Sequence, residues 1–432
     1  MTTTFPGATW ESKTPENAGV NSAKLNKFVI ALGTGSGVII KDGYLIKSWG
    51  DQTIKFDWAS AAKPVTTTMM LFALKENKIS SLDELTRPYV QTLTGLDYIT
   101  KDRSITFRHL INMVSGYALS ESPGTHWAYN DYGVNLYSKI LFDVIFKQTA
   151  NIATTTRLSP LQFQDGSVYS SRSGYGVSTT PRDFARIGLL LLNKYNWKGT
   201  QLLPISYFDI HTKILVSNNT PVSPSTTIND YLSIGSYGGS ANQNTYGPGI
   251  YGSAIWFNEL VGTTQNRSFP NSPLDTFEAN GHSGKEVMVI IPSLGIIAAA
   301  KGNWGGFNPG ISNSPDNLIL KLLTDSIIQP TIFTRKITIS GNGTVNIFKN
   351  GTLIGTATQT TPFNYSANIG DTIIRESVGS LDQWCNLQNV CNTEIVTSST
   401  FISTSTPHQE YIYYFITVIP CNPSVCDFII TQ

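Results

Sequence analysis

The sequence has little charge and no long apolar run. Asp, Glu, Lys and Arg make up 14% of the 432 residues, and the formal net charge is only +1. An average soluble protein is roughly 25% charged. We therefore expect no electrostatic attraction to nucleic acid or to an anionic membrane. Because no stretch of about 18 apolar residues occurs, we also expect no transmembrane segment.

Cysteine is absent from most of the chain. All four cysteines lie after residue 384, at Cys385, Cys391, Cys421 and Cys426. Two close pairs in a β-rich segment favour one or two disulfides, with the connectivity left open. A zinc site is the alternative, although these spacings are looser than those of zinc knuckles. Disulfides would favour an extracellular or periplasmic location.

The first residues, Met1–Pro6, have neither the basic nor the apolar region of a signal peptide. We therefore expect one of two situations. Either the protein stays in the cytoplasm, or a signal peptide has been removed from an exported protein. A composition rich in Thr, Ser, Asn and Gly is typical of exported proteins and favours the second.

Several enzyme motifs are also missing. A His-Glu-x-x-His pair, a Walker loop and Gly-x-Gly-x-x-Gly after a strand do not occur, and the five histidines are too scattered to indicate a metal centre. Gly281-His282-Ser283-Gly284-Lys285 differs from a nucleophile elbow at its fifth position, which is Lys instead of Gly. We therefore predict neither a metal nor another cofactor.

The pattern of helices and strands changes near residue 329. Before it, the predicted helices are 22–32, from Ser60 to about Lys78, 181–192 and 315–327, and the predicted strands are 37–40, 44–49, 253–257, 287–291 and 295–300. Helices that flank hairpin-joined strands predict an α+β domain with an antiparallel sheet in residues 1–329.

Residues 330–432 show a different pattern. Short alternating strands are predicted at 336–340, 344–349, 352–358, 363–366, 372–376, 400–403 and 410–419, with Asn350-Gly351 as one hairpin turn. Strands at this spacing predict a separate accessory β-sandwich. We expect it to bind a cell surface, a glycan or a protein.

A long segment without periodicity lies inside the first predicted domain. From Val216 to Tyr251 the sequence is rich in Ser, Asn, Gly, Thr and Tyr. Loops of this length in a compact domain are usually functional. We therefore predict that the segment forms the wall or the lid of a cleft.

Ser60 and Lys63 stand three residues apart at the predicted start of a helix. Residues at this spacing share a helix face, so the ammonium group can reach the hydroxyl. A helix N-terminus also favours negative charge beside the serine. This geometry suits a serine nucleophile with lysine as its proton acceptor. The spacing alone, however, favours a simpler interpretation, in which Ser60 caps the helix and Lys63 is solvated.

Other segments, in the same order, resemble the serine β-lactamase and penicillin-recognising superfamily. The resemblance is to the branch with class C β-lactamases, D,D-peptidases and related esterases and amide hydrolases. Ser60-Ala61-Ala62-Lys63 matches the Ser-x-x-Lys box, Tyr129-Asn130-Asp131 stands where the family has Tyr-x-Asn, and His282-Ser283-Gly284 takes the place of Lys-Thr-Gly on the strand at the cleft edge. Segments 105–110, 178–188 and 198–204 are similar as well, so the resemblance spans residues 8–328.

The resemblance implies a β-lactamase/transpeptidase-like fold and an acyl-enzyme mechanism. Ser60 would attack a carbonyl, and Lys63, desolvated in the cleft, would be easier to deprotonate and would accept the serine proton. Tyr129 would share this relay and pass a proton to the leaving group. The backbone N–H groups of Ser60 and Lys285 would form the oxyanion hole. Asp131 would orient the substrate amide or Lys63.

Two positions depart from the family pattern. Asp131 replaces Asn, and its carboxylate can hold Lys63 in the charged form. His282 replaces Lys, which removes a fixed positive charge for a substrate carboxylate; alternatively, His282 only forms hydrogen bonds at the strand edge. Both changes point away from β-lactams and peptidoglycan stem peptides.

We therefore expect a serine hydrolase that cleaves the ester or amide bond of a small-molecule or peptide-like acyl substrate. One alternative is penicillin-binding, β-lactamase or D,D-peptidase activity. Another is an acylated sensor or binding protein that scarcely turns over.

Overall fold

The computed structural model describes residues 3–166, 168–171, 174–261 and 266–328, and beyond them the strands listed below and the turn at residues 360–361. The chain divides into two compact units, Met1–Ile328 and Gln329–Gln432. The first has helices and a large antiparallel sheet, and the second has strands, which confirms the predicted fold class. The assignment of the second unit as an accessory domain stays a prediction.

The described helices include nine α-helices. They are α1 (Ser22–Ala31), α2 (Lys63–Lys75), α3 (Arg87–Thr94), α4 (Phe107–Ile111), α5 (Asp131–Lys139), α6 (Ala150–Arg157), α7 (Pro181–Leu192), α8 (Ile205–His211) and α9 (Pro315–Asp325). A 3₁₀ turn at Ala59–Ala62 precedes α2, and a π-helix at Ile140–Phe146 continues α5. None of the described helices is both long and apolar enough to cross a bilayer.

The first unit contains twelve described strands. They are β1 (Ser36–Lys41), β2 (Tyr44–Trp49), β3 (Phe56–Asp57), β4 (Val168–Ser171), β5 (Gly176–Thr179), β6 (Asn196–Trp197), β7 (Thr200–Gln201), β8 (Tyr251–Gly252), β9 (Ile255–Phe257), β10 (Phe277–Gly281), β11 (Glu286–Ile291) and β12 (Ile296–Lys301).

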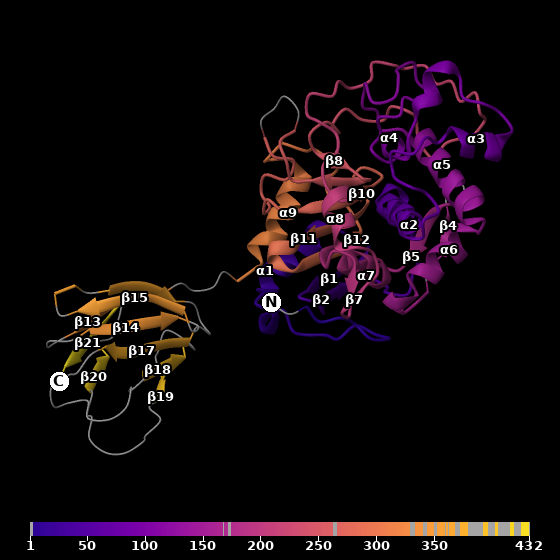
Figure 1. The fold of residues 1–432 in the computed structure, drawn as a ribbon. Coiled ribbons are helices and arrows are strands. Elements are labelled where there is room, and N and C mark those ends of the chain that lie inside the picture. Colours follow the sequence, from indigo (N-terminus) through magenta and orange to yellow (C-terminus); the bar gives the residue numbers. More distant parts are fainter. Residues whose placement is uncertain are drawn as a thin grey trace. The chain divides into compact units, whose positions relative to one another are not determined.

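A seven-stranded antiparallel sheet is the centre of the first unit. Its order is β2-β1-β12-β11-β10-β9-β8, so β1 from the N-terminal hairpin pairs with β12 from the end of the unit (Figure 1). The hairpin turns through Asp42 and Gly43, both with positive φ, as the Asp-Gly pair predicts. Helices α2–α7 all come from the chain between β2 and β8.

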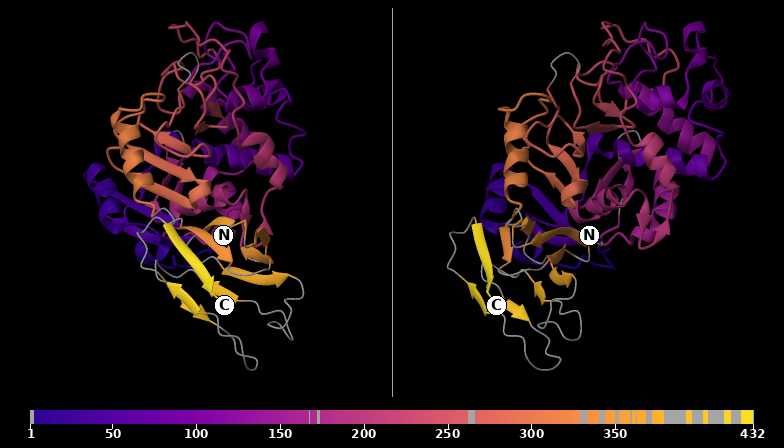
Figure 2. Two further views of the ribbon diagram at one scale, coloured as in Figure 1. Left: turned by 90° about the vertical axis from the view of Figure 1, so that its left-hand side faces the viewer. Right: turned by 60° about the vertical axis from the view of Figure 1, so that its left-hand side comes forward.

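Helices cover both faces of this sheet. On one face Phe28 of α1 makes edge-to-face contact with Trp49 of β2. Helix α9 packs against α1, and both lie beside the sheet (Figure 2). Helix α7 packs on β1, β11 and β12 from the other face. The central strands β1, β11 and β12 are therefore almost entirely buried, and their near-continuous apolar runs follow from that burial.

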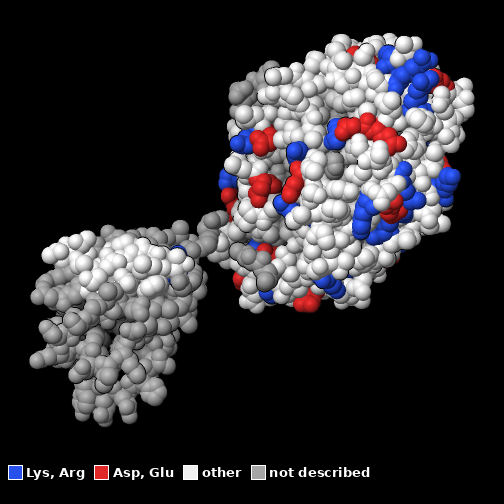
Figure 3. Space-filling model, viewed as in Figure 1, with Lys and Arg blue, Asp and Glu red and all other residues white. Residues whose placement is uncertain are grey.

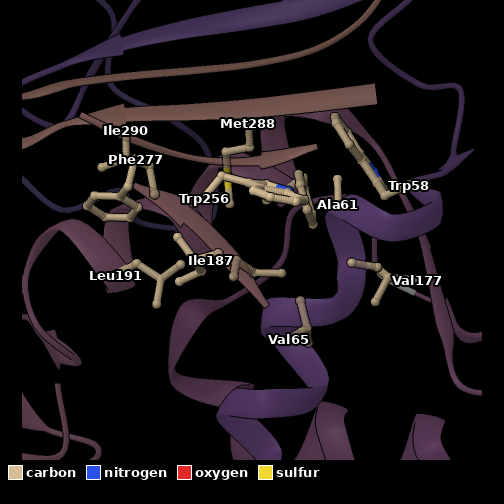
Figure 4. Close-up of a cluster of buried hydrophobic side chains, with 14 of the residues drawn as sticks. Trp58, Ala61, Val65, Val177, Ile187, Leu191, Trp256, Phe277, Met288 and Ile290 are labelled. Atoms are coloured by element: carbon tan, nitrogen blue, oxygen red, sulfur yellow. The ribbon is translucent and has the colours of Figure 1, made fainter. Parts of the chain in front are cut away.

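Helix α2 runs through the interior of the helical region. Its residues Lys63–Ala73 are all buried, and the hydroxyl of Thr68 donates to the Pro64 carbonyl four residues back. Ala61 and Val65, at its start, face a cluster that includes Met288 of β11 (Figure 4). Apolar packing therefore fixes the position of the segment that carries Ser60 and Lys63.

The predicted α1, α7, β1, β2 and α9 agree with the structure within a few residues. Helix α2 is shorter than predicted, because Ser60 lies in the 3₁₀ turn and the α-helix begins at Lys63. Residues 216–250 contain no helix or strand apart from one bridge between Val222 and Trp127, as predicted for a long loop. The sequence did not predict β10.

The described strands of the second unit are β13 (Phe333–Ile339), β14 (Thr344–Lys349), β15 (Thr352–Thr358), β16 (Phe363–Ala367), β17 (Thr372–Val378), β18 (Asn392–Ile395), β19 (Ile402–Thr404), β20 (Phe415–Val418) and β21 (Val425–Thr431). They form sheets of order β16-β13-β21-β20 and β15-β14-β17-β18-β19. The sequence missed β18 and β21. The partner expected for this unit stays a prediction.

Charged side chains are sparse and mixed on the surface of the first unit. On the face that Figure 3 presents, acidic and basic groups lie close to one another, with uncharged surface between the groups. This agrees with a composition of 30 basic and 29 acidic residues.

The contact of α7 with the sheet gives a stability prediction. A Cβ on Gly188 would lie 2.8 Å from both the Ile297 and the Met288 side chains, whereas one on Gly133 of α5 would meet nothing closer than 3.4 Å. We expect Gly188→Ala to lower the free energy of unfolding by roughly 1–3 kcal/mol through overpacking. Gly133→Ala should leave it unchanged or raise it by up to about 1 kcal/mol, because alanine favours helix. Urea unfolding of both variants would test this, and equal effects would contradict it.

Candidate active site

The N-terminal end of α2 opens into a cavity of about 160 Å³. Its walls include every residue of the predicted catalytic and substrate-binding set except Lys63, Gly284 and Lys285. The full lining is Ala59, Ser60, Tyr129, Asp131, Gly238, Gly239, Gln243, Asn244, Trp256, Asn280, His282, Ser283 and Phe307. The predicted boxes, which are far apart in sequence, therefore meet at one place.

The turn that carries Ser60 is anchored in the core by the preceding residue pair, Trp58 and Ala59. Trp58 is fully buried, stacks on Phe184 at 4.0 Å between ring centroids, and donates from its indole to the Thr179 carbonyl. Ala59 has φ of 49°, an uncommon conformation for a non-glycine residue. Strained backbone of this kind is often found at functional sites. Ser60 itself is partly exposed to the cavity.

Strand β10 lies directly against this turn. A Cβ at Gly281 would lie 2.7 Å from the Trp58 carbonyl oxygen, so a glycine is required where the strand meets the turn. The end of β10 thus comes close to Ser60, and the residues that follow Gly281 border the same cavity.

Lys63 is the central group of the site. Its Nζ lies 2.7 Å from the Ser60 hydroxyl, 2.7 Å from the Tyr129 hydroxyl and 2.7 Å from the Asp131 carboxylate. An ammonium group has three N–H donors, and here each has an oxygen within reach. The side chain is 1% exposed. The simpler interpretation, in which Lys63 is a solvated residue of the first helical turn, is wrong.

The charge state of Lys63 is decided by two opposing effects. Burial is the largest influence and lowers the pKa, but the negative charge of Asp131 and the contacts with Tyr129 together outweigh it, so the pKa of Lys63 is raised. The expectation that desolvation makes Lys63 easier to deprotonate is therefore wrong. The alternative, that Asp131 holds the lysine charged, agrees with the structure.

Tyr129 is fixed by aromatic packing. It is 6% exposed and stacks on Trp256 with 5.9 Å between centroids and 10° between planes. Tyr251 meets it edge-on at 6.1 Å. This packing fixes the orientation of the Tyr129 ring. Its hydroxyl contacts Lys63, and the residue lines the cavity.

The long loop positions both Tyr129 and Asp131. The Asp131 N–H donates to the Ser240 carbonyl, the Tyr237 N–H donates to the Asp131 carbonyl, and the Gln243 N–H donates to the Tyr129 carbonyl. Because the loop also lines the cavity through residues 238–239 and 243–244, the predicted cleft wall is confirmed.

The third box lies in a turn, not in a strand. Strand β10 ends at Gly281, and His282 and Ser283 follow with φ of 43° and 51°. The strand position implied by the resemblance is therefore wrong by one residue. The Asn280 side chain closes the turn by accepting from the Gly284 N–H.

Lys285 does not fit its predicted role in the oxyanion hole. Its N–H donates to the Gly281 carbonyl at 3.0 Å within the turn. Lys285 also does not line the cavity. We correct this assignment, because an N–H already bonded inside the turn is not directed at a substrate oxygen.

His282 is joined to a buried acid. Its Nδ1 lies 2.8 Å from Glu286, whose side chain is 2% exposed and whose other oxygen lies 3.2 Å from the Lys301 ammonium. The suggestion that His282 forms hydrogen bonds at the strand edge is thus compatible with the structure. His282 nevertheless also lines the cavity.

Sequence reasoning missed several residues of the cavity. Trp256 and Phe307 form an aromatic wall, with 4.5 Å between their centroids. Asn280 and the buried Glu286 support the turn. An aromatic or an amide in a strand gives no sequence signal of a site, so only their position in space reveals them.

The structure does not test the predicted disulfides. Cys385, Cys391 and Cys421 lie outside the described residues, and the side chain of Cys426 is not described. In the rest of the chain that the structure describes, no cluster of three or more His, Cys, Asp or Glu could hold a metal ion.

Comparisons with known proteins find a matching family model and several similar solved structures. The family model described as Beta-lactamase matches residues 35–259, just over half of the chain. Among solved structures, a protein from Bacteroides dorei provisionally described as a β-lactamase is similar at 16% identity, with a TM-score of 0.51, 72% of this chain and 100% of that chain covered. No curated protein matches.

Two further structures are similar at lower scores. A penicillin-binding protein homologue from Caulobacter crescentus is 11% identical, with a TM-score of 0.48, 74% of this chain and 99% of that chain covered. Unliganded simvastatin synthase from Aspergillus terreus is 14% identical, with a TM-score of 0.45, 73% of this chain and 97% of that chain covered.

Proposed function

Because this chain belongs to the β-lactamase family, whose model covers residues 35–259, we propose that it is a serine hydrolase that works through an acyl-enzyme on Ser60. The observation that carries the proposal is the contact of one buried ammonium group with Ser60, Tyr129 and Asp131, all three at 2.7 Å. A capped helix with a solvated lysine would not bury these groups together at a cavity.

The proton relay proposed here keeps Lys63 charged at its beginning and end. Tyr129 begins the step as the phenolate beside the ammonium group of Lys63. As the Ser60 oxygen attacks the substrate carbonyl carbon, Lys63 gives one of its protons to this phenolate and receives the Ser60 proton in exchange. Tyr129 then gives its phenolic proton to the leaving oxygen or nitrogen as that bond breaks. The products are the acyl-serine ester and the protonated leaving group. Asp131 stabilises the ammonium form throughout.

The oxyanion hole needs two backbone donors. The Ser60 N–H fits one of them, since no residue in the described part of the chain accepts it. For the second we propose the Ser283 N–H in place of that of Lys285. Ser283 lines the cavity, and its N–H likewise has no acceptor among the described residues.

The cavity favours an uncharged acyl substrate. Its lining contains no Lys or Arg, and it does contain the carboxylate of Asp131. Lys63 lies beneath this surface with its charge already balanced by Asp131. A substrate carboxylate would therefore meet no fixed positive charge, while Trp256 and Phe307 offer an apolar surface. This favours a small neutral ester or amide over a β-lactam or a stem peptide.

The catalytic serine is tested by covalent labelling. A fluorophosphonate probe reacts with an activated serine hydroxyl, so it should label wild type stoichiometrically and fail with Ser60→Ala. The matched control Ser122→Ala removes an exposed hydroxyl and should label like wild type. Labelling of the Ser60→Ala variant at the wild-type rate, measured by intact-protein mass spectrometry, would sink the proposal.

The charge preference is tested with two esters of the same chain length. p-Nitrophenyl butyrate is neutral, and p-nitrophenyl hemisuccinate carries a carboxylate at the far end of the acyl chain. The hemisuccinate carboxylate would lose hydration in a cavity whose lining offers no Lys or Arg, and this costs on the order of 1 kcal/mol or more even when the group stays partly solvated. We expect kcat/KM for the hemisuccinate to be lower by roughly tenfold or more. Equal values, or a preference for the hemisuccinate, would show that the cavity supplies a cation after all.

A further inference from the structure

The cavity contains a second acid–base group that the Lys63 relay does not use. His282 lines it together with Ser60, Tyr129 and Asp131, and its Nδ1 lies 2.8 Å from the Glu286 carboxylate. We propose that His282, oriented by Glu286, is the general base that activates the water which releases the acyl group from Ser60. This inference rests on the proposed function.

The contact with Glu286 determines which imidazole nitrogen is basic. A carboxylate can only accept a hydrogen bond, so Nδ1 of the neutral ring must carry the hydrogen. The proton-accepting nitrogen is then Nε2. The same pairing of a carboxylate with Nδ1 orients the histidine of serine-protease triads. Glu286 acts here as a positioning residue.

The groups around His282 and Glu286 stabilise the orientation of the imidazole ring. Glu286 is 2% exposed, and Lys301 of β12 balances its charge at 3.2 Å. The titratable groups that face His282 are therefore Glu286 with Lys301 on the sheet side, and Tyr129 and Asp131 with the buried Lys63 around the cavity.

The backbone of the turn also points to a functional position. His282 and Ser283 both have left-handed φ values, and residues other than glycine pay roughly 1–2 kcal/mol each for this conformation. The bonds from the Gly284 N–H to Asn280 and from the Lys285 N–H to Gly281 hold the turn in place. Strain that the surrounding structure maintains is common at active sites.

Lys63 is poorly suited to the same task. Asp131, 2.7 Å away, holds Lys63 in its charged form, and an ammonium nitrogen has no lone pair to offer a water molecule. A neutral imidazole has a lone pair on its unprotonated nitrogen, as a general base requires. His282 thus complements the ammonium relay.

The proposed step balances as follows. The water oxygen bonds to the acyl carbonyl carbon while one water proton passes to Nε2 of His282. The bond between that carbon and the Ser60 oxygen then breaks, and the proton held on Nε2 of His282 passes to the serine oxygen. The products are the free acid, the Ser60 hydroxyl and neutral His282.

The experiment follows p-nitrophenyl acetate hydrolysis by stopped flow, with mass spectrometry of quenched samples. The variant is His282→Asn, because asparagine tolerates the left-handed backbone. We expect a full nitrophenolate burst, a steady-state rate lower by roughly 10²–10⁴-fold and an acetyl group that accumulates on Ser60. Hydroxylamine, a stronger nucleophile that needs no general base, should restore turnover. The control His126→Asn should behave like wild type.

Glu286→Gln separates positioning from a merely structural role. The steady-state rate should fall by roughly tenfold or more, while the nitrophenolate burst keeps its full amplitude, because the carboxylate orients the ring for deacylation only. A burst amplitude that falls by the same factor as the steady-state rate would contradict the role of Glu286.

The outcomes distinguish the two proposals. If wild type forms no adduct on Ser60, the proposed function fails. If wild type forms the adduct but His282→Asn turns over at the wild-type rate, only the role of His282 fails. A loss of burst and turnover by the same factor, with fluorophosphonate labelling also lost, would place His282 in acylation and overturn the proposal as well.

Discussion

A buried ammonium group with three oxygen partners is the constraint on which the site depends. An isolated charge in the interior costs several kcal/mol, so Lys63 must be paired. Asp131 supplies the opposite charge, and Ser60 and Tyr129 supply the other two acceptors. One pairing thus accounts for the raised pKa of the lysine, for the alignment of nucleophile and phenol, and for a cavity that has no cation left for a substrate carboxylate.

The fold is arranged to maintain this pairing. Apolar packing of α2 on the core holds Ser60 and Lys63, while backbone bonds from the loop at residues 216–250 hold Tyr129 and Asp131. The tight turn after β10 brings His282 to the same cavity. Three separate parts of the chain therefore supply the chemical groups of the site.

Features that depend on nearby residues could be predicted from the sequence. The Ser60–Lys63 spacing and the Asp42-Gly43 hairpin are local, and the structure agrees with them. Strand β10 was not predicted, because Glu278 and Asn280 interrupt its apolar pattern although both are buried. The commitment of the Lys285 N–H to Gly281 and the charge state of Lys63 depend on distances of about 3 Å between particular atoms, which no sequence pattern specifies.

The charge on Lys63 is the central claim, and an NMR titration measures it directly. With ¹³C-labelled lysine, the Cε resonance of Lys63 can be assigned by its loss in Lys63→Arg. The account predicts no titration of this resonance in wild type up to at least pH 10.5, the ordinary pKa of lysine. In Asp131→Asn the pKa should fall, because burial persists without the opposing carboxylate. A wild-type resonance that titrates at about pH 7–8, as in lysines tuned to act as neutral bases, would contradict the account.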